Sequence, residues 1–358
     1  MNLAEDPMTN GNTSDVSNVR DDEHLDWPKL EQWLRERIEG LKGPMRVGQF
    51  HGGHANLTYC VSFDDLEFVV RRQPHGEIPP GAHDMARENR VLKALGEVFP
   101  FSPRSIAFCE NENVVGAPFV VMERRHGIVI RDFIPAPLAT MDDVERRVSM
   151  ALVDAMASLH SIDATVSGLN SLGRPEGFVE RQLEDWSKRW RLSNELPNAM
   201  FDATYTKLKS TRPESRRIAV VHNDLKLDNC MFASDNPDEV SAIFDWDMAT
   251  LGDPLIELGT LLSYWREEGD QLPRAPTIKL DMTSFPTRGE LIERYSQCGI
   301  DMTHIRWYEA FGLWKHAVVL QQLYNRFERG QSKDLRLGEL KPNIDITLEI
   351  AHGVASTI

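Results

Sequence analysis

The stretch VHNDLKLDN (Val221–Asn229) decides the fold of this chain. It follows a short apolar run that predicts a buried strand, and it places Asp224 and Asn229 five residues apart in the loop after that strand. A second apolar strand is predicted at Val240–Phe244, and it is followed directly by Asp245. Polar side chains at the ends of buried strands indicate a functional site, because an unpaired buried charge is costly.

The residue types at these strand ends suit phosphoryl transfer to an alcohol. That reaction needs one carboxylate that orients the acceptor hydroxyl and takes its proton, together with oxygen ligands for Mg²⁺. Asp224 suits the first role, and Asn229 and Asp245 suit the second. We interpret His222 as a brace for the loop backbone. Asp253 precedes a proline and an apolar run, which predicts a helix N-cap.

The motif HxDxxxxN, followed by strand-Asp-Trp-Asp and then Gly-Asp-Pro, resembles the aminoglycoside phosphotransferase and choline-kinase-like family of small-molecule kinases. His222–Phe232 and Ala242–Gly259 are most similar to a branch associated with acyl-CoA dehydrogenases. The resemblance covers roughly residues 45–330 and implies ATP, Mg²⁺ and a hydroxyl-bearing small molecule as acceptor. It implies an α+β, bilobal protein-kinase-like fold with a small antiparallel-sheet N-lobe and a larger, mainly helical C-lobe. Lys226 matches the lysine that faces the transferred phosphate in this fold.

The N-terminal half contains a matching set of candidate nucleotide contacts. A glycine-containing segment between two predicted strands can bring backbone N–H groups close to phosphates. In the strand Phe68–Arg71, alternation places Val69 and Arg71 on one face, as in the kinase strand that sets an apolar residue against adenine and a cation at the phosphates. The family usually has lysine at the Arg71 position. Glu88, on the helix that follows, is the natural partner of that cation. Glu123 comes directly after the strand Phe119–Met122, where the hinge between the two lobes of a kinase presents backbone groups to adenine. The candidate nucleotide-binding residues are Gly52, Gly53, His54, Asn56, Val69, Arg71, Glu88 and Glu123.

Composition and the remaining pattern predict a tail and two lobes. Residues 1–26 carry seven acidic residues against one arginine and almost no large apolar residues, which predicts a disordered acidic tail. Residues 27–124 are predicted to form the nucleotide-binding N-lobe, in which Val114-Val115 and Phe119–Met122 form a hairpin. Residues 125–358 are predicted to form the helical C-lobe with the catalytic loop and the substrate pocket. The roles of two further acids, Asp228 and Asp247, stay open.

Several function classes are disfavoured by the sequence. The chain of 358 residues has 40 Lys+Arg and 55 Asp+Glu, and a formal net charge of −15 argues against nucleic-acid binding. The four cysteines are scattered, and no apolar run is long enough to span a membrane, so we expect a cytoplasmic protein. The sequence contains no dinucleotide-binding glycine motif that opens a helix, no P-loop and no GxSxG element.

Two alternatives remain open at this point. The first concerns turnover: arginine in place of lysine at position 71 leaves room for a nucleotide-binding protein of the same fold with little or no kinase activity. The second concerns the acceptor, for which we rank a metabolite such as a hydroxyacyl compound above an aminoglycoside. The sequence does not predict an oligomeric state.

Overall fold

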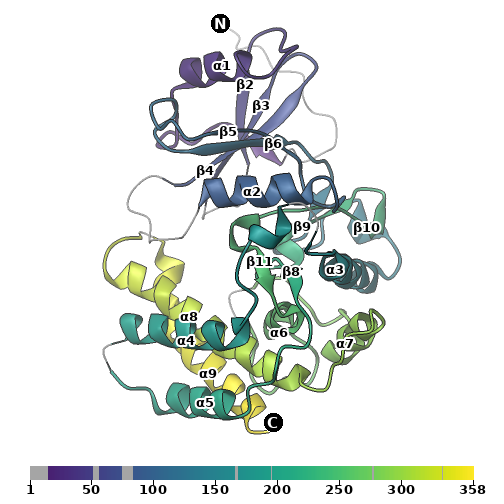
Figure 1. The fold of residues 1–358 in the computed structure, drawn as a ribbon, viewed down its shortest axis with the longest axis vertical. Coiled ribbons are helices and arrows are strands. Elements are labelled where there is room, and N and C mark those ends of the chain that lie inside the picture. Colours follow the sequence, from purple (N-terminus) through teal and green to yellow (C-terminus); the bar gives the residue numbers. More distant parts are fainter. Residues whose placement is uncertain are drawn as a thin grey trace, which may run out of the picture. The chain divides into compact units, whose positions relative to one another are not determined.

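The computed structural model describes residues 15–50, 56–74, 84–165, 168–194, 196–275, 278–332 and 334–358. Contacts divide the chain into two units, which are drawn together in Figure 1. The first unit comprises residues 1–90 and 104–124, and the second comprises residues 91–103 and 125–358. The sequence placed all of 27–124 in one lobe, whereas the segment 91–103 makes its contacts within the second unit.

The first unit is built around an antiparallel sheet. In the described part of the chain six strands form it, in the order β1-β2-β3-β4-β6-β5. The strands are rich in β-branched and aromatic residues, which suit a pleated and half-buried surface. Helix α1 begins at the N-cap Asp26, whose side chain accepts a hydrogen bond from the backbone N–H of Lys29. The bounds are β1 Val16–Ser17, α1 Trp27–Arg35, β2 Arg46–Phe50, β3 Leu57–Ser62, β4 Glu67–Arg72, β5 Ser105–Cys109 and β6 Phe119–Glu123.

Residues 15–26 belong to this sheet unit, which differs from the prediction of a disordered tail through residue 26. Strand β1 pairs with β2. The Tyr59 hydroxyl donates to the Glu23 carbonyl at 2.7 Å, and the backbone N–H of Arg20 donates to the Gln49 side chain at 2.9 Å. The segment has few apolar residues, but Val19 and Leu25 pack against the core and other residues make polar contacts with the sheet, which composition does not reveal. The rest of the predicted tail lies outside the described residues.

The hydrophobic core of the first unit contains residues of α1 and of one face of the sheet. Trp33 of α1 meets Phe119 of β6 edge to face, with ring centroids 4.8 Å apart. Strand β4 contributes Phe68 and Val70 to the same core. Because side chains alternate along a strand, Val69 and Arg71 lie on the opposite face of β4.

The predicted strand at Val114-Val115 is wrong. Both valines are buried in the core of the first unit, but they lie in a turn where the Val114 N–H donates to the Asn111 carbonyl at 3.3 Å. The partner of β6 at this edge is β5, which the sequence analysis did not identify. The side chains of two adjacent apolar residues can be buried whether the backbone forms a turn or a strand. A short apolar pair therefore predicts burial more reliably than it predicts strand structure.

The second unit is mainly helical, as predicted (Figure 1). Short strands alternate with the helices and position the polar loop residues: β8 pairs with β11, and β9 lies between β7 and β10. Helix α2 (Met85–Leu95) runs from residues of the first unit into residues of the second. No helix in the described ranges combines the length and the hydropathy needed to cross a bilayer. The bounds are β7 Ile128–Val129, α3 Val144–Ser161, α4 Phe178–Ser193, α5 Ala199–Ser210, β8 Ala219–Val221, β9 Cys230–Ala233, β10 Asn236–Ile243, β11 Thr250–Gly252, α6 Pro254–Tyr264, α7 Arg288–Ser296, α8 Ile305–Glu328 and α9 Lys341–Ala355.

Helices α6 and α8 form the central crossing of the second unit. They approach so closely that a Cβ atom on Gly259 of α6 would overlap the Tyr308 backbone, and one on Gly312 of α8 would overlap the backbone of Gly259. Only glycine at these two positions permits the contact without displacing a helix. The close crossing brings side chains of α8 to the loop that follows β8.

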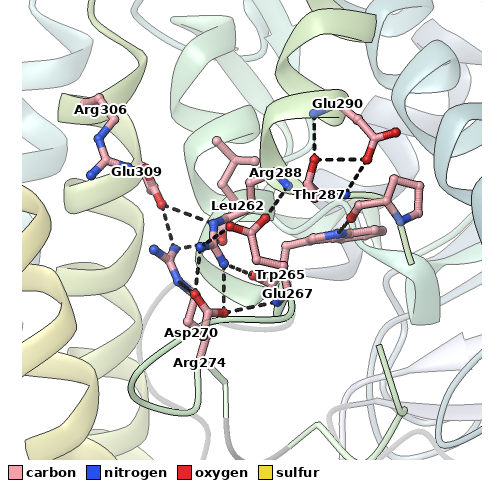
Figure 2. A network of polar contacts seen from close by, with 11 residues as sticks. Leu262, Trp265, Glu267, Asp270, Arg274, Thr287, Arg288, Glu290, Arg306 and Glu309 are labelled. Atoms are coloured by element: carbon pink, nitrogen blue, oxygen red, sulfur yellow. Dashed lines mark hydrogen bonds and ion pairs between the residues drawn. The ribbon is translucent and has the colours of Figure 1, made fainter. Parts of the chain in front are cut away.

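The segment between α6 and α7 is attached to α8 by a buried ionic network (Figure 2). Arg274 lies 2.7 Å from the Glu309 carboxylate of α8. Arg288 donates to both carboxylate oxygens of Asp270, at 2.9 Å and 2.7 Å. The buried Arg274 and the partly buried Arg288 therefore each face a carboxylate, which is the condition under which burial of such charges is tolerated.

Candidate active site

Asp224 lies in the loop after β8, and its carboxylate is held by residues of the same loop. The side-chain amide of Asn229 donates to Asp224 Oδ2 at 3.0 Å and to the Asp224 backbone carbonyl at 2.7 Å. The ammonium of Lys226 lies 3.3 Å from the same Oδ2, and 26% of the Asp224 side chain is exposed. The carboxylate is thus fixed in orientation and remains accessible, which are the requirements for a base that meets a diffusible substrate.

Glu257 of α6 fixes the two peptide groups that precede Asp224. The backbone N–H of His222 donates to Glu257 Oε2 at 3.1 Å, and that of Asn223 donates to Oε1 at 2.8 Å. The imidazole of His160 lies 2.6 Å from Oε2. Burial alone would raise the pKa of Glu257, but the hydrogen bond with His160 and the backbone N–H donors hold that pKa below its ordinary value. A buried carboxylate therefore anchors the loop.

His222 and the Phe244 backbone connect the loop to the end of β10. His222 Nε2 lies 2.7 Å from the Phe244 carbonyl, which confirms the interpretation of this histidine as a brace. The Phe244 N–H donates to the Asn229 carbonyl at 2.9 Å. Because Asp245 follows Phe244 directly, Asn229 and Asp245 are brought to neighbouring positions. Asp245 has φ of +69°, a left-handed conformation that costs about 1–3 kcal/mol and that is often found at functional sites.

The oxygen donors for a magnesium ion are present at this point of the chain. The nitrogen of the Asn229 amide is turned toward Asp224, which leaves the amide oxygen as its ligand atom, and Asp245 supplies a carboxylate. Within the described ranges no group of three or more His, Cys, Asp or Glu side chains converges on a metal position. Mg²⁺ does not need such a cage, because it keeps waters and phosphate oxygens as ligands. The donor set therefore fits a magnesium ion shared with nucleotide phosphates.

Lys226 provides a fixed positive charge beside Asp224. Burial alone would lower its pKa, but the carboxylates of Asp224 and Asp228 raise it above the ordinary value, so the ammonium stays charged. Its Nζ lies 3.6 Å from Asp228 and 5.5 Å from the ring centroid of Tyr264. Asp228 thus contacts Lys226, while Asp247 lies partly buried in the turn after Asp245.

In the first unit, Arg71 and Glu88 form the predicted pair. Arg71 Nε lies 3.2 Å from Glu88 Oε2, with side chains 11% and 1% exposed. Val69 shares the face of Arg71 on β4. Arg72 points the other way and donates to the Val115 carbonyl at 2.6 Å. As the alternation of side chains predicts, Val69 and Arg71 therefore share one face of β4 and Arg72 lies on the other.

The other residues that were predicted to contact the nucleotide lie partly inside and partly outside the described ranges. Asn56 is buried immediately before β3. Glu123 ends β6, where its N–H donates to the Arg104 carbonyl at 2.9 Å and its carboxylate lies 3.3 Å from Arg104 Nε. The Glu123 N–H is therefore paired with the Arg104 carbonyl, and the role of this residue in nucleotide binding stays a prediction. Gly52, Gly53 and His54 lie outside the described residues.

Three residues of the site were missed by sequence reasoning. Glu257 had a local signal, because it is the one acid in the apolar run Pro254–Leu262. His160 and Lys315 had none, since both lie on distant helices: His160 contacts Glu257, and Lys315 contacts the loop itself. Lys315 of α8 donates to the Asn223 carbonyl at 3.2 Å.

Comparisons with known proteins show what this chain is similar to. Residues 46–289 match the model of a family described as the phosphotransferase enzyme family. Acyl-CoA dehydrogenase family member 11 of Rattus norvegicus is 30% identical over 365 residues, which cover 97% of this chain and 46% of the relative. The chain thus spans about half the length of this relative.

Solved structures show the same fold. A putative aminoglycoside phosphotransferase from Ralstonia eutropha is 28% identical, with a TM-score of 0.77 over 93% of this chain and 99% of that one. An aminoglycoside phosphotransferase in ternary complex with AMP-PNP and hygromycin B is 15% identical, with a TM-score of 0.56 over 92% of this chain and 97% of that one. These matches confirm the predicted kinase-like fold class and the predicted relationship to acyl-CoA dehydrogenase family members.

Proposed function

Because the chain belongs to the phosphotransferase enzyme family, we propose that it is a kinase that transfers the γ-phosphoryl group of ATP to a hydroxyl group of a small molecule. The observation that carries the proposal is the convergence of Lys226 and Asn229 on one carboxylate oxygen of Asp224, with Asp245 at the neighbouring strand end. This set supplies a base, a cation and two oxygen ligands, which are the parts that phosphoryl transfer requires.

In the proposed reaction Asp224 accepts the proton of the acceptor hydroxyl as its oxygen bonds to the γ-phosphorus. The bond between that phosphorus and the β–γ bridging oxygen breaks, and ADP leaves with the electron pair. Asn229 holds Asp224 in the orientation for proton transfer, and Lys226 faces the negative charge on the transferred group. Asn229 and Asp245 would hold Mg²⁺, which neutralises charge on the phosphates when it is bound.

The first unit is proposed to bind the nucleotide. Arg71, oriented by the buried Glu88, would contact phosphate oxygens, because a guanidinium keeps its charge and offers two parallel N–H donors. Val69 on the same face of β4 would lie against adenine. The glycine-containing segment with Gly52 and Gly53 would cover the phosphates, and His54, Asn56 and Glu123 complete the proposed set.

The proposed acceptor is a hydroxyl-bearing metabolite, and a hydroxyacyl compound is the first to test. Relatives that match almost the full length of this chain are named acyl-CoA dehydrogenase family members, and the chain covers about half of their length. An aminoglycoside, as bound by the structurally similar phosphotransferases, is the second class of acceptor.

An acceptor panel with matched deoxy analogues tests the function. Wild-type protein with Mg·ATP should release ADP and form a phosphate ester only with a hydroxyl-bearing member, and the analogue without the hydroxyl should give neither. Asp224→Asn should lower kcat by about 10²–10⁴-fold, because a general base contributes that much, while the affinity for Mg·ATP stays near wild type. Detection of the ester by mass spectrometry separates transfer from ATP hydrolysis.

The alternative is a nucleotide-binding protein without turnover. Its specific support is Arg71 at the position where the family usually has lysine. It would be favoured if the wild-type protein bound Mg·ATP but phosphorylated no member of the panel, and if Asp224→Asn left the slow hydrolysis of ATP unchanged.

A further inference from the structure

The backbone at Asn223, directly before Asp224, is held in an unfavourable conformation. Asn223 has φ of +70°, in the left-handed region, and it is not a glycine. Its backbone N–H donates to Glu257, and its side-chain Nδ2 donates to the Met248 carbonyl at 2.9 Å. Its carbonyl accepts the third bond, from Lys315. Hydrogen bonds on three sides thus hold the peptide before Asp224 in place.

Lys315 reaches this carbonyl because of the close crossing of α6 and α8. It lies three residues after Gly312, one turn beyond the point of closest approach. Its Nζ is 3.2 Å from the Asn223 carbonyl and 5.4 Å from the ring centroid of Trp186 on α4. Lys315 is 5% exposed, so its ammonium lies inside the second unit.

In the part of the chain that the structure describes, the ammonium is buried without an ion-pair partner. Among the described residues its one hydrogen bond is the bond to Asn223, and no acidic side chain lies within ion-pair distance. The charged groups that face it are Asp224 and Lys226 of the loop, Glu257 of α6 and Arg189 of α4. Burial lowers the pKa of Lys315 to about 8, although both acids favour its charged form. Burial of an ammonium without an ion-pair partner among the described residues costs folding free energy, and methionine would fill the same space without that cost.

We propose that Lys315 is a positioning residue for Asp224: its charged amino group holds the Asn223 carbonyl and so fixes the carboxylate against the acceptor hydroxyl. Glu257 and Lys315 then act on opposite sides of the same residue, the anion on the N–H and the cation on the carbonyl. The kinetic part of this inference rests on the proposed function of Asp224, whereas the structural part does not.

Hydrogen exchange tests the structural part without any acceptor. Lys315→Met keeps the size of the side chain and removes the charge. We expect amide exchange in the segment 219–229 to become about tenfold faster in this variant, with the rest of the second unit unchanged. Lys315→Arg should restore protection, and Lys188→Met, at an exposed position of α4, is the matched control. Wild-type protection in Lys315→Met would overturn the inference.

Steady-state kinetics with the acceptor found in the panel test the catalytic part. Lys315→Met should lower kcat about ten- to hundredfold with an unchanged KM for ATP, because small misplacement of a catalytic group has effects of this size. In the wild type, kcat should fall as the pH rises through about 8, where Lys315 loses its charge. The fall should be absent in Lys315→Met and shifted to higher pH in Lys315→Arg.

The outcomes separate this inference from the proposed function. If the panel gives no phosphate ester while exchange changes as expected, the kinase function fails and the positioning role stands. If esters form but Lys315→Met keeps the wild-type kcat and the same decrease of kcat above about pH 8, Lys315 has no positioning role. If Lys315→Arg fails to fold, hydrogen exchange in the wild-type protein still tests the inference. Protection of the segment 219–229 from exchange must decrease between pH 7 and pH 9, because Lys315 loses its charge in that range.

Discussion

Replacement of Arg71 by alanine should weaken nucleotide binding without changing the reaction at Asp224. The guanidinium lies on the face of β4 opposite the hydrophobic core, and Glu88 orients it at 3.2 Å. One charge-assisted hydrogen bond to a phosphate contributes about 1.5–3 kcal/mol, so its loss should raise the Kd for Mg·ATP about ten- to 150-fold. Isothermal titration with AMP-PNP, well below the melting temperature, measures this Kd. Arg71→Lys should keep most of the affinity, since the family usually has lysine there.

Arg72→Ala is the matched control for this experiment. Arg72 is 3% exposed and donates to the Val115 carbonyl at 2.6 Å, so its removal leaves a buried acceptor unpaired. We expect a loss of stability of about 1–3 kcal/mol and a nucleotide Kd close to wild type. The opposite pattern, with Arg72→Ala damaging binding and Arg71→Ala harmless, would show that the wrong face of β4 has been assigned to the nucleotide.

Two further predictions concern the metal and the N-terminal segment. Asp245→Ala should abolish the Mg²⁺ dependence of nucleotide affinity, and Asn229→Ala should reduce it less, because a neutral amide is the weaker ligand. Titration of ATP with and without Mg²⁺ measures both effects. An unchanged Mg²⁺ dependence in Asp245→Ala would contradict the assignment of Asp245 as a metal ligand. Deletion of residues 2–24 should lower the melting temperature by several degrees relative to deletion of residues 2–14, because it removes β1 and the Glu23 carbonyl that accepts from Tyr59. Equal melting temperatures would show that these contacts add nothing to stability.

The parts of the site that could be predicted are those that the chain builds locally. Asp224 and Asn229 belong to one loop, and a single backbone hydrogen bond from Phe244 to Asn229 brings Asp245 beside them. The two faces of β4 follow from the alternation of any strand, so Arg71 could be separated from Arg72 without a structure. Such inferences need only spacing and the local geometry of loops and strands.

The parts that could not be predicted depend on contacts between distant segments. Residues 15–26 looked disordered because they have few apolar residues, whereas their contacts with the sheet and with the core, including those of Val19 and Leu25, involve distant parts of the chain. Val114 and Val115 looked like a strand because burial and strand structure give the same pattern over two residues. Lys315 is one lysine in a 24-residue helix, and only the crossing of α6 and α8 gives it a partner 92 residues earlier in the chain.

The loop 222–229 therefore contains the proposed catalytic residues but does not by itself stabilise its own conformation. The left-handed backbone at Asn223 costs about 1–3 kcal/mol. The hydrogen bonds from the Asn223 N–H to Glu257 and from Lys315 to its carbonyl involve charged groups, which contribute about 1.5–3 kcal/mol each and together offset that cost. Both charges come from the buried helices α6 and α8, which meet at Gly259 and Gly312. Larger side chains at either glycine would separate the helices and release the loop, although no residue of the motif had changed.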